Sequence, residues 1–249
     1  RVGCFQLPVV DLLYTPTSEV LMVRLGELER DGRAHEGVGA FREASAKLAF
    51  AFLPFTAFLL AVAPELLAAF FGPKFLPAVP LFRVAVLGVV LAVLPMDGVL
   101  RARGQTRWLF VSYLVKAAVT VPLVVAGVKL FGMMGGVLSW LLAEGVGKAT
   151  LLARVPRALQ GPGQQLAVRD VLPWRALAQA SGAALLAGLC VLGARALAPQ
   201  ALHAALPPGL LGRALPLALA GVLVTASYVG LLYAAGIRVP WPRRAAASP

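Results

Sequence analysis

Eight polar side chains that could bind an ion or a charged group lie inside segments that are otherwise apolar. They are carboxylates, ammonium groups and hydroxyls: Asp11, Thr15, Ser18, Glu19, Asp97, Lys116, Glu144 and Lys148. A charged side chain in hydrocarbon is costly, so such residues generally face water, a partner charge or a ligand. Carboxylates accept protons or cations, and ammonium groups attract phosphates. These residues are therefore the candidate binding residues.

The first four of these residues have a helical spacing. Asp11, Thr15, Ser18 and Glu19 stand at i, i+4, i+7 and i+8, which places them along one face of a helix. The two carboxylates on that face are suited to a cation or a proton. The alternative is that the first segment is frayed and partly exposed rather than buried in the membrane, and both interpretations stay open.

The other four charges lie on three consecutive apolar segments. Glu144 and Lys148 are four residues apart in the order that favours an intrahelical ion pair. Asp97 has Arg101 four residues later, a pair expected to extend to the membrane interface. Counted from the expected cytoplasmic ends, Asp97, Lys116, Glu144 and Lys148 all occupy the inner halves of their segments. This common depth predicts a hydrated vestibule that opens to the cytoplasm.

Lys116 has no acidic residue three or four positions away on its own segment. Three interpretations of this ammonium group stay open. It contacts an anionic ligand, it pairs with Glu144 on the next segment, or it reaches along the helix to the cytoplasmic headgroups.

The elements that must position these residues are membrane-spanning helices. Hydrophobic residues make up 59% of the 249 residues and charged residues 14%, and the mean hydropathy is +0.82. Soluble domains are about half apolar and about a quarter charged. The apolar residues form blocks of about 20, the length that crosses the hydrocarbon core of a bilayer. We predict an all-α transmembrane bundle of about seven spans, at 2–23, 48–70, 81–100, 108–128, 133–153, 176–197 and 214–236.

The positions of the cationic residues predict how the chain is oriented. Of the 23 Lys and Arg residues, fifteen lie in one set of alternate loops: Arg24, Arg30, Arg33, Arg42, Lys47, Arg101, Arg103, Arg107, Arg154, Arg157, Arg169, Arg175, Arg238, Arg243 and Arg244. The opposite loops and their helix ends hold five. Cytoplasmic loops carry such an excess, so the chain starts outside the plasma (inner) membrane and ends in the cytoplasm. Membrane topology accounts for the net charge of +12, and we expect no nucleic-acid partner.

Motifs for covalent chemistry or metal binding are not found. Cys4 and Cys190 lie on different segments without a CxxC spacing, and only His35 and His203 accompany them, so neither a disulfide framework nor a metal site is indicated. No serine or cysteine triad is recognisable. We therefore expect a protein that is not an enzyme and that uses no cofactor.

Prolines and loop sequences divide the chain further. Pro16, Pro54, Pro95, Pro122 and Pro216 lie inside expected spans, where each removes a backbone hydrogen bond and favours a kink. Such kinks serve either static packing or bending during transport, and both uses stay open. The break at 160–165 predicts a cytoplasmic linker over 158–175, followed by a separable helix pair and tail over 176–249.

The middle of the chain resembles a known family. The run LAAFFGPKFLPAVPLFRV at 67–84, the run RARGQTR at 101–107 and the run FGMMGG at 131–136 resemble loop signatures of polysaccharide biosynthesis flippases. These belong to the multidrug/oligosaccharidyl-lipid/polysaccharide exporter superfamily. The resemblance covers about 48–157 and concerns the C-terminal half of such a carrier, so it identifies 1–157 as a transmembrane lobe of five spans.

The resemblance implies a carrier that moves a polyprenyl-diphosphate-linked oligosaccharide across the membrane for cell-surface polysaccharide assembly. It implies an N-terminal lobe of the same protein as a partner, membrane lipid around both lobes, and no transport by this chain alone. Lys116, with Lys148, would then meet the diphosphate.

Two rival functions stay open. A cation exporter of the same superfamily would use Asp11, Glu19 and Glu144 as acidic groups. A membrane subunit or a fragment that does not transport would only pack against a partner. The sugar, the coupling ion and the oligomeric state do not follow from the sequence.

Overall fold

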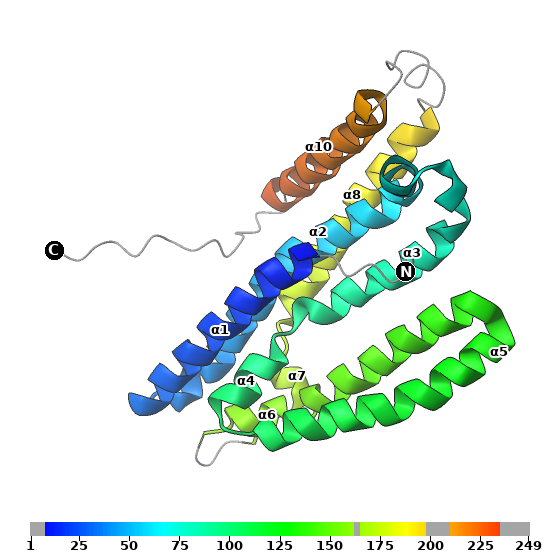
Figure 1. The fold of residues 1–249 in the computed structure, drawn as a ribbon. Helices are drawn as coiled ribbons and strands as arrows, with labels where there is room; N and C mark the ends of the chain where they lie inside the picture. Colours follow the sequence, from blue (N-terminus) through cyan, green and yellow to red (C-terminus); the bar gives the residue numbers. More distant parts are fainter. Residues whose placement is uncertain (1–7, 162–164, 198–209, 235–249) are drawn as a thin grey trace.

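The computed structural model describes residues 8–161, 165–197 and 210–234 (Figure 1). Every secondary-structure element in these ranges is a helix, which confirms the predicted all-α fold. The elements are α1 (Pro8–Arg30), η2 (Ala34–Glu36), α2 (Gly37–Phe71), η3 (Pro73–Ala78), α3 (Val79–Val86), η4 (Leu87–Val93), α4 (Met96–Ala102), α5 (Thr106–Leu152), α6 (Val155–Leu159), α7 (Val168–Val171), α8 (Trp174–Leu197) and α10 (Leu210–Ala234).

Four helical segments within the described ranges are long and apolar enough to cross a membrane. They are Ala34–Phe71, Pro73–Ala102, Thr106–Leu159 and Trp174–Gly193. α1 is not among them, because it carries charged side chains along its length, including Asp11, Glu19 and Arg24. The membrane class of the protein is thus supported, while the number of seven spans stays a prediction.

α5 is a hairpin of two helical limbs rather than one helix. Gly132 has φ +60° and ψ −142°, a conformation outside the helical region, and the chain reverses there (Figure 1, green). Only glycine adopts such a conformation readily. We call residues 106–131 the first limb and 133–152 the second limb. They correspond to the two spans that the sequence predicts at 108–128 and 133–153.

A break interrupts the helical segment between residues 79 and 102. The 3₁₀ helix η4 ends at Val93, and Leu94 is extended at φ −106° and ψ 108°. The next helix, α4, starts at Met96. Pro95 at this break cannot donate a backbone hydrogen bond, which favours interruption of the helix. By contrast, Pro16, Pro54 and Pro122 lie within helices that continue past them.

α2 is the central helix of the bundle. It packs against α1, α3, α8, α10 and η4, and its buried residues take part in three apolar clusters. The α5 hairpin instead packs against α3, η4, α4 and α6, and its turn leans away from the group formed by α2, α8 and α10 (Figure 1). α8 and α10 share an apolar core with α2, and the division into separate domains stays a prediction.

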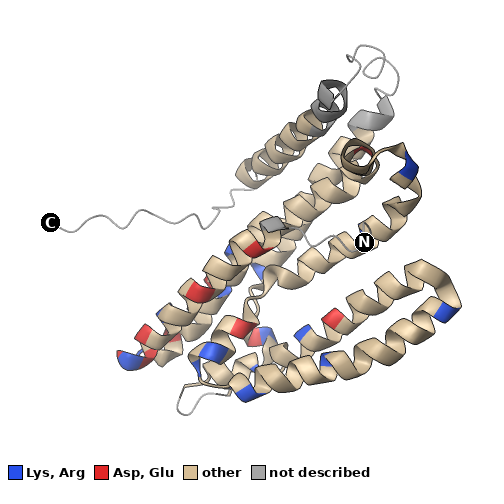
Figure 2. Ribbon diagram, viewed as in Figure 1, with Lys and Arg blue, Asp and Glu red and all other residues tan. Residues whose placement is uncertain are grey.

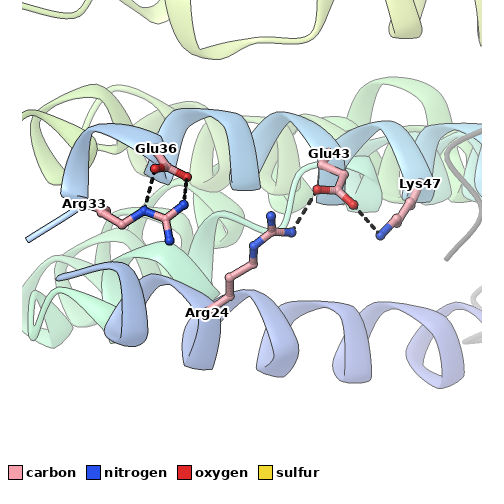
Figure 3. Close-up of polar contacts among 5 residues, drawn as sticks. All are labelled: Arg24, Arg33, Glu36, Glu43 and Lys47. Carbon is pink, nitrogen blue, oxygen red and sulfur yellow. Dashed lines mark hydrogen bonds and ion pairs between the residues drawn. The ribbon is translucent and has the colours of Figure 1, made fainter. Parts of the chain in front are cut away.

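The cation-rich connections that are described meet at one end of the bundle (Figure 2). Arg103, between α4 and α5, pairs with Glu29 near the end of α1 at 2.8 Å. Arg154, after the second limb, lies 3.3 Å from the ring centroid of Trp108 at the start of the first. Ion pairs within this end also join Arg33 to Glu36, and Glu43 to Arg24 and Lys47 (Figure 3). The described cationic connections thus gather at one end of the bundle, and the cytoplasmic location of that end stays a prediction.

Labelling with a membrane-impermeant maleimide tests this location. With Cys4 and Cys190 replaced by Ser, Gln105→Cys at the start of α5 is expected to react only after the membrane is permeabilised. The matched variant Lys74→Cys, in η3 at the other end, is expected to react in intact cells. Reaction of Gln105→Cys from outside would overturn the predicted orientation.

Candidate functional site

The candidate site lies where α1, the start of α4 and the two limbs of α5 come together. Six polar side chains form it, and we call them the polar cluster: Tyr14, Ser18, Asp97, Lys116, Glu144 and Lys148. Five of them are among the candidates that the sequence predicts. The break at Pro95 places Asp97 in the first turn of α4, directly beside α1.

Asp97 is held by two hydroxyl groups of α1. The Tyr14 hydroxyl donates a hydrogen bond to its Oδ1, and Ser18 Oγ donates to Oδ2 at 3.3 Å. Gly98 permits this close approach, because a Cβ at that position would lie 2.7 Å from the carbonyl oxygen of Ser18. Arg101 is 3.8 Å from the same carboxylate. The sequence therefore predicts the Asp97–Arg101 pair correctly but not the two contacts with α1.

Lys148 reaches from the second limb to α1. Its Nζ lies 5.2 Å from the centroid of the Tyr14 ring, a cation–π distance. Lys148 also interacts electrostatically with Asp97, Glu144 and Lys116. Tyr14 thus contacts an anion through its hydroxyl and a cation through its ring, and it links α1 to both α4 and α5.

Lys116 and Glu144 form an ion pair across the α5 hairpin. Their side chains are 29% and 22% exposed. Gly147 makes room for the lysine stem, because a Cβ there would be 3.2 Å from Lys116 Cδ. The intrahelical pair of Glu144 with Lys148 is not the one formed, because the hairpin brings Lys116 closer to the carboxylate. Of the three interpretations of Lys116, pairing with Glu144 is the one that the structure contains.

The polar stripe expected on α1 is divided. Ser18 is buried and faces Asp97, together with Tyr14 four residues earlier. Asp11, Thr15 and Glu19 are exposed and lie outside the polar cluster. Of these four residues only Ser18 belongs to the polar cluster, and both interpretations of the first segment stay open. Successive side chains of a helix are about 100° apart, so Glu19 is turned by about 100° from Ser18, whereas Asp11 lies nearly in line with Ser18 but about two turns earlier in the helix.

Tyr14 is the site residue that the sequence analysis misses. An aromatic residue in an apolar segment is usually a packing residue. The sequence feature that could have identified Tyr14 is its position four residues before Ser18, which puts both hydroxyls on the same side of α1.

The charges of the polar cluster balance locally. Two carboxylates, Asp97 and Glu144, face two ammonium groups, Lys116 and Lys148, and Arg101 adds a positive charge at the edge. The arrangement thus offers ammonium groups, which attract anions, and carboxylates, which attract cations. Among the described residues, no three His, Cys, Asp or Glu side chains are grouped as a metal site requires.

An apolar groove lies beside the second limb. It has a volume of about 520 Å³ and is lined by Leu87, Val90 and Leu91 of the η4 helix and by residues of the second limb such as Leu141, Gly145 and Ala149. All of the side chains that line it are apolar.

A comparison with known protein families, curated proteins and solved structures finds no match for this chain. The structure supports the class of all-helical membrane proteins for this chain. Its function must therefore be argued from the polar cluster.

Proposed function

We propose that this chain belongs to a membrane carrier that moves a lipid-linked saccharide with a phosphate or diphosphate headgroup from the cytoplasmic to the outer leaflet. The observation that carries this proposal is the meeting of two lysines and two carboxylates beside a helix break, in segments apolar enough to cross a membrane.

A helix break at this place supports transport. Carriers commonly form their substrate sites at discontinuous helices, where irregular backbone lines a cavity. η4 adds seven residues of 3₁₀ helix before the break, and long 3₁₀ stretches often mark hinges or strain. Asp97 follows this hinge directly, so movement there would change its contacts with Tyr14 and Ser18.

The available charge in the polar cluster supports an anionic substrate. Asp97 is occupied by Tyr14, Ser18 and Arg101, and Glu144 is occupied by Lys116. Within the described ranges, Lys148 has no carboxylate oxygen within ion-pair distance, and its ammonium group rests on an aromatic ring. Phosphate oxygens form strong charge-assisted hydrogen bonds with such a group. We therefore assign the first headgroup contact to Lys148, from which the headgroup passes to the neighbouring Lys116.

A cation exporter is the second candidate. Asp11 and Glu19 favour it, because both carboxylates are exposed on α1 and a carboxylate facing lipid is costly unless water or a cation covers it.

Transport assays with the natural protein in vesicles test the two candidates against each other. A fluorescent prenyl diphosphate is expected to cross between leaflets, while a fluorescent organic cation stays on its side. Movement of the cation but not of the anionic lipid would refute the proposed function and favour the exporter.

A further inference from the structure

The Glu144 carboxylate contacts the Lys116 ammonium group, which an anionic ligand would also contact. A carboxylate and a phosphate both present negatively charged oxygens to an ammonium group, so they compete for it. The pair is partly shielded, with Lys116 at 29% and Glu144 at 22% side-chain exposure. Shielding strengthens the attraction of Lys116 for any anion that reaches it.

Glu144 has a second cationic partner within reach. Lys148 stands four residues later on the same helix, the spacing and order that favour an intrahelical ion pair. The two residues already interact electrostatically, although Lys148 lies over the Tyr14 ring. Side chains four residues apart on a helix are neighbours, so a side-chain rotation can exchange the partner across the hairpin for one on the same limb.

We propose that Glu144 is an internal competitor for the anionic headgroup at Lys116, displaced by an incoming phosphate and then paired with Lys148. This inference rests on the proposed function only in taking a phosphate group as the anionic ligand. Exchange gives Glu144 a new partner when the ligand takes Lys116, which avoids an unpaired carboxylate inside the membrane. It also draws Lys148 from Tyr14, so that arrival of the ligand weakens the contact between α5 and α1.

Binding of geranyl diphosphate to the purified 249-residue chain in lipid nanodiscs tests the competition. Glu144→Gln removes the competing charge at nearly constant size, so it is expected to lower the Kd about tenfold, equivalent to about 1.4 kcal/mol. Glu144→Asp keeps a shorter carboxylate, and its Kd is expected to lie between those of the wild type and Glu144→Gln. Lys116→Met should weaken binding, and adding Glu144→Gln to it should give no further gain.

Glu43→Gln is the matched control. Glu43 also forms ion pairs, with Arg24 and Lys47, at the cation-rich end of the bundle (Figure 3), so this variant loses a paired carboxylate outside the polar cluster. Its Kd is expected to equal that of the wild type. The thermal unfolding of each variant shows whether a change in Kd reflects misfolding.

The outcomes separate this inference from the proposed function. An unchanged or higher Kd for folded Glu144→Gln, or an equal gain for Glu43→Gln, would overturn the internal competitor even if the natural protein moves prenyl diphosphates. If Glu144→Gln binds more tightly but the natural protein moves no such lipid, the competitor stands and the proposed function fails.

Discussion

Replacing Lys148 by Met is expected to reduce transport of the prenyl diphosphate by about 10- to 100-fold while the protein still folds and inserts. Hydrogen bonds to charged groups contribute about 1.5–3 kcal/mol, which corresponds to this range of affinity. Lys148 has no carboxylate partner at ion-pair distance in the described ranges, so its removal leaves no carboxylate unpaired there. The methionine still fills the space beside Tyr14. The rate at which the natural protein moves the prenyl diphosphate between leaflets is measured in vesicles, and size-exclusion chromatography determines the amount of folded protein.

Two variants make this experiment specific. Lys148→Arg keeps the charge, although the different shape of the guanidinium group changes the contact, so partial transport is expected. Lys74→Met is the matched control, because Lys74 also lies over an aromatic ring, that of Phe75 at 5.4 Å, but in η3 outside the polar cluster. Its transport rate should equal that of the wild type. Well-folded Lys148→Met protein with an unchanged rate would remove Lys148 from the substrate site.

The sequence predicts which charges matter better than how they pair. Asp97, Lys116, Glu144 and Lys148 are recognisable because hydropathy defines the segments and the expected cytoplasmic ends define a common depth. The partner of Glu144 is set by the register between the two limbs of α5, which follows from the turn at Gly132. Helical spacing reports only neighbours on the same helix, so it favours Lys148, while the tertiary contact selects Lys116.

Proline positions in the sequence are similarly incomplete as a guide to the fold. Pro54, Pro95 and Pro122 all lie inside apolar segments, but only the segment of Pro95 stops being helical. A proline removes one hydrogen bond in each case. The outcome depends on neighbouring helices: beside Pro95, Gly98 lets α4 approach α1 closely and Asp97 gains contacts with its hydroxyls. Such compensation is tertiary, and a single segment of sequence does not contain it.

The close contact of the two α5 limbs gives the largest expected effect on stability. Gly127 and Gly135 face each other so closely that a Cβ on Gly135 would overlap the carbonyl group of Gly127. Ser139 Oγ adds a hydrogen bond across the hairpin to the carbonyl oxygen of Leu123 at 2.7 Å. Small residues allow such backbone contact between membrane helices, where packing rather than the hydrophobic effect drives association. The two glycines therefore hold together the limbs that carry Lys116 and Glu144.

Gly135→Leu is expected to lower the free energy of unfolding by about 3 kcal/mol, because the limbs must separate to accommodate the side chain. Separation should also break the Lys116–Glu144 ion pair and move Lys116 away from the second limb. An ideal Cβ at Gly147 lies 3.3 Å from Lys116 Cβ, so a disulfide between Lys116→Cys and Gly147→Cys should form readily with glycine at 135 and poorly with Gly135→Leu. Unfolding in denaturant and the extent of this disulfide are the two measurements, both made with Cys4 and Cys190 replaced by Ser.

The control is Gly145→Leu on the same limb, where an added Cβ has no heavy atom within 4 Å and stability should be unchanged or slightly higher. Equal stability and equal disulfide formation for Gly135→Leu and Gly145→Leu would contradict the packed hairpin, and with it the pairing across the limbs on which the site depends.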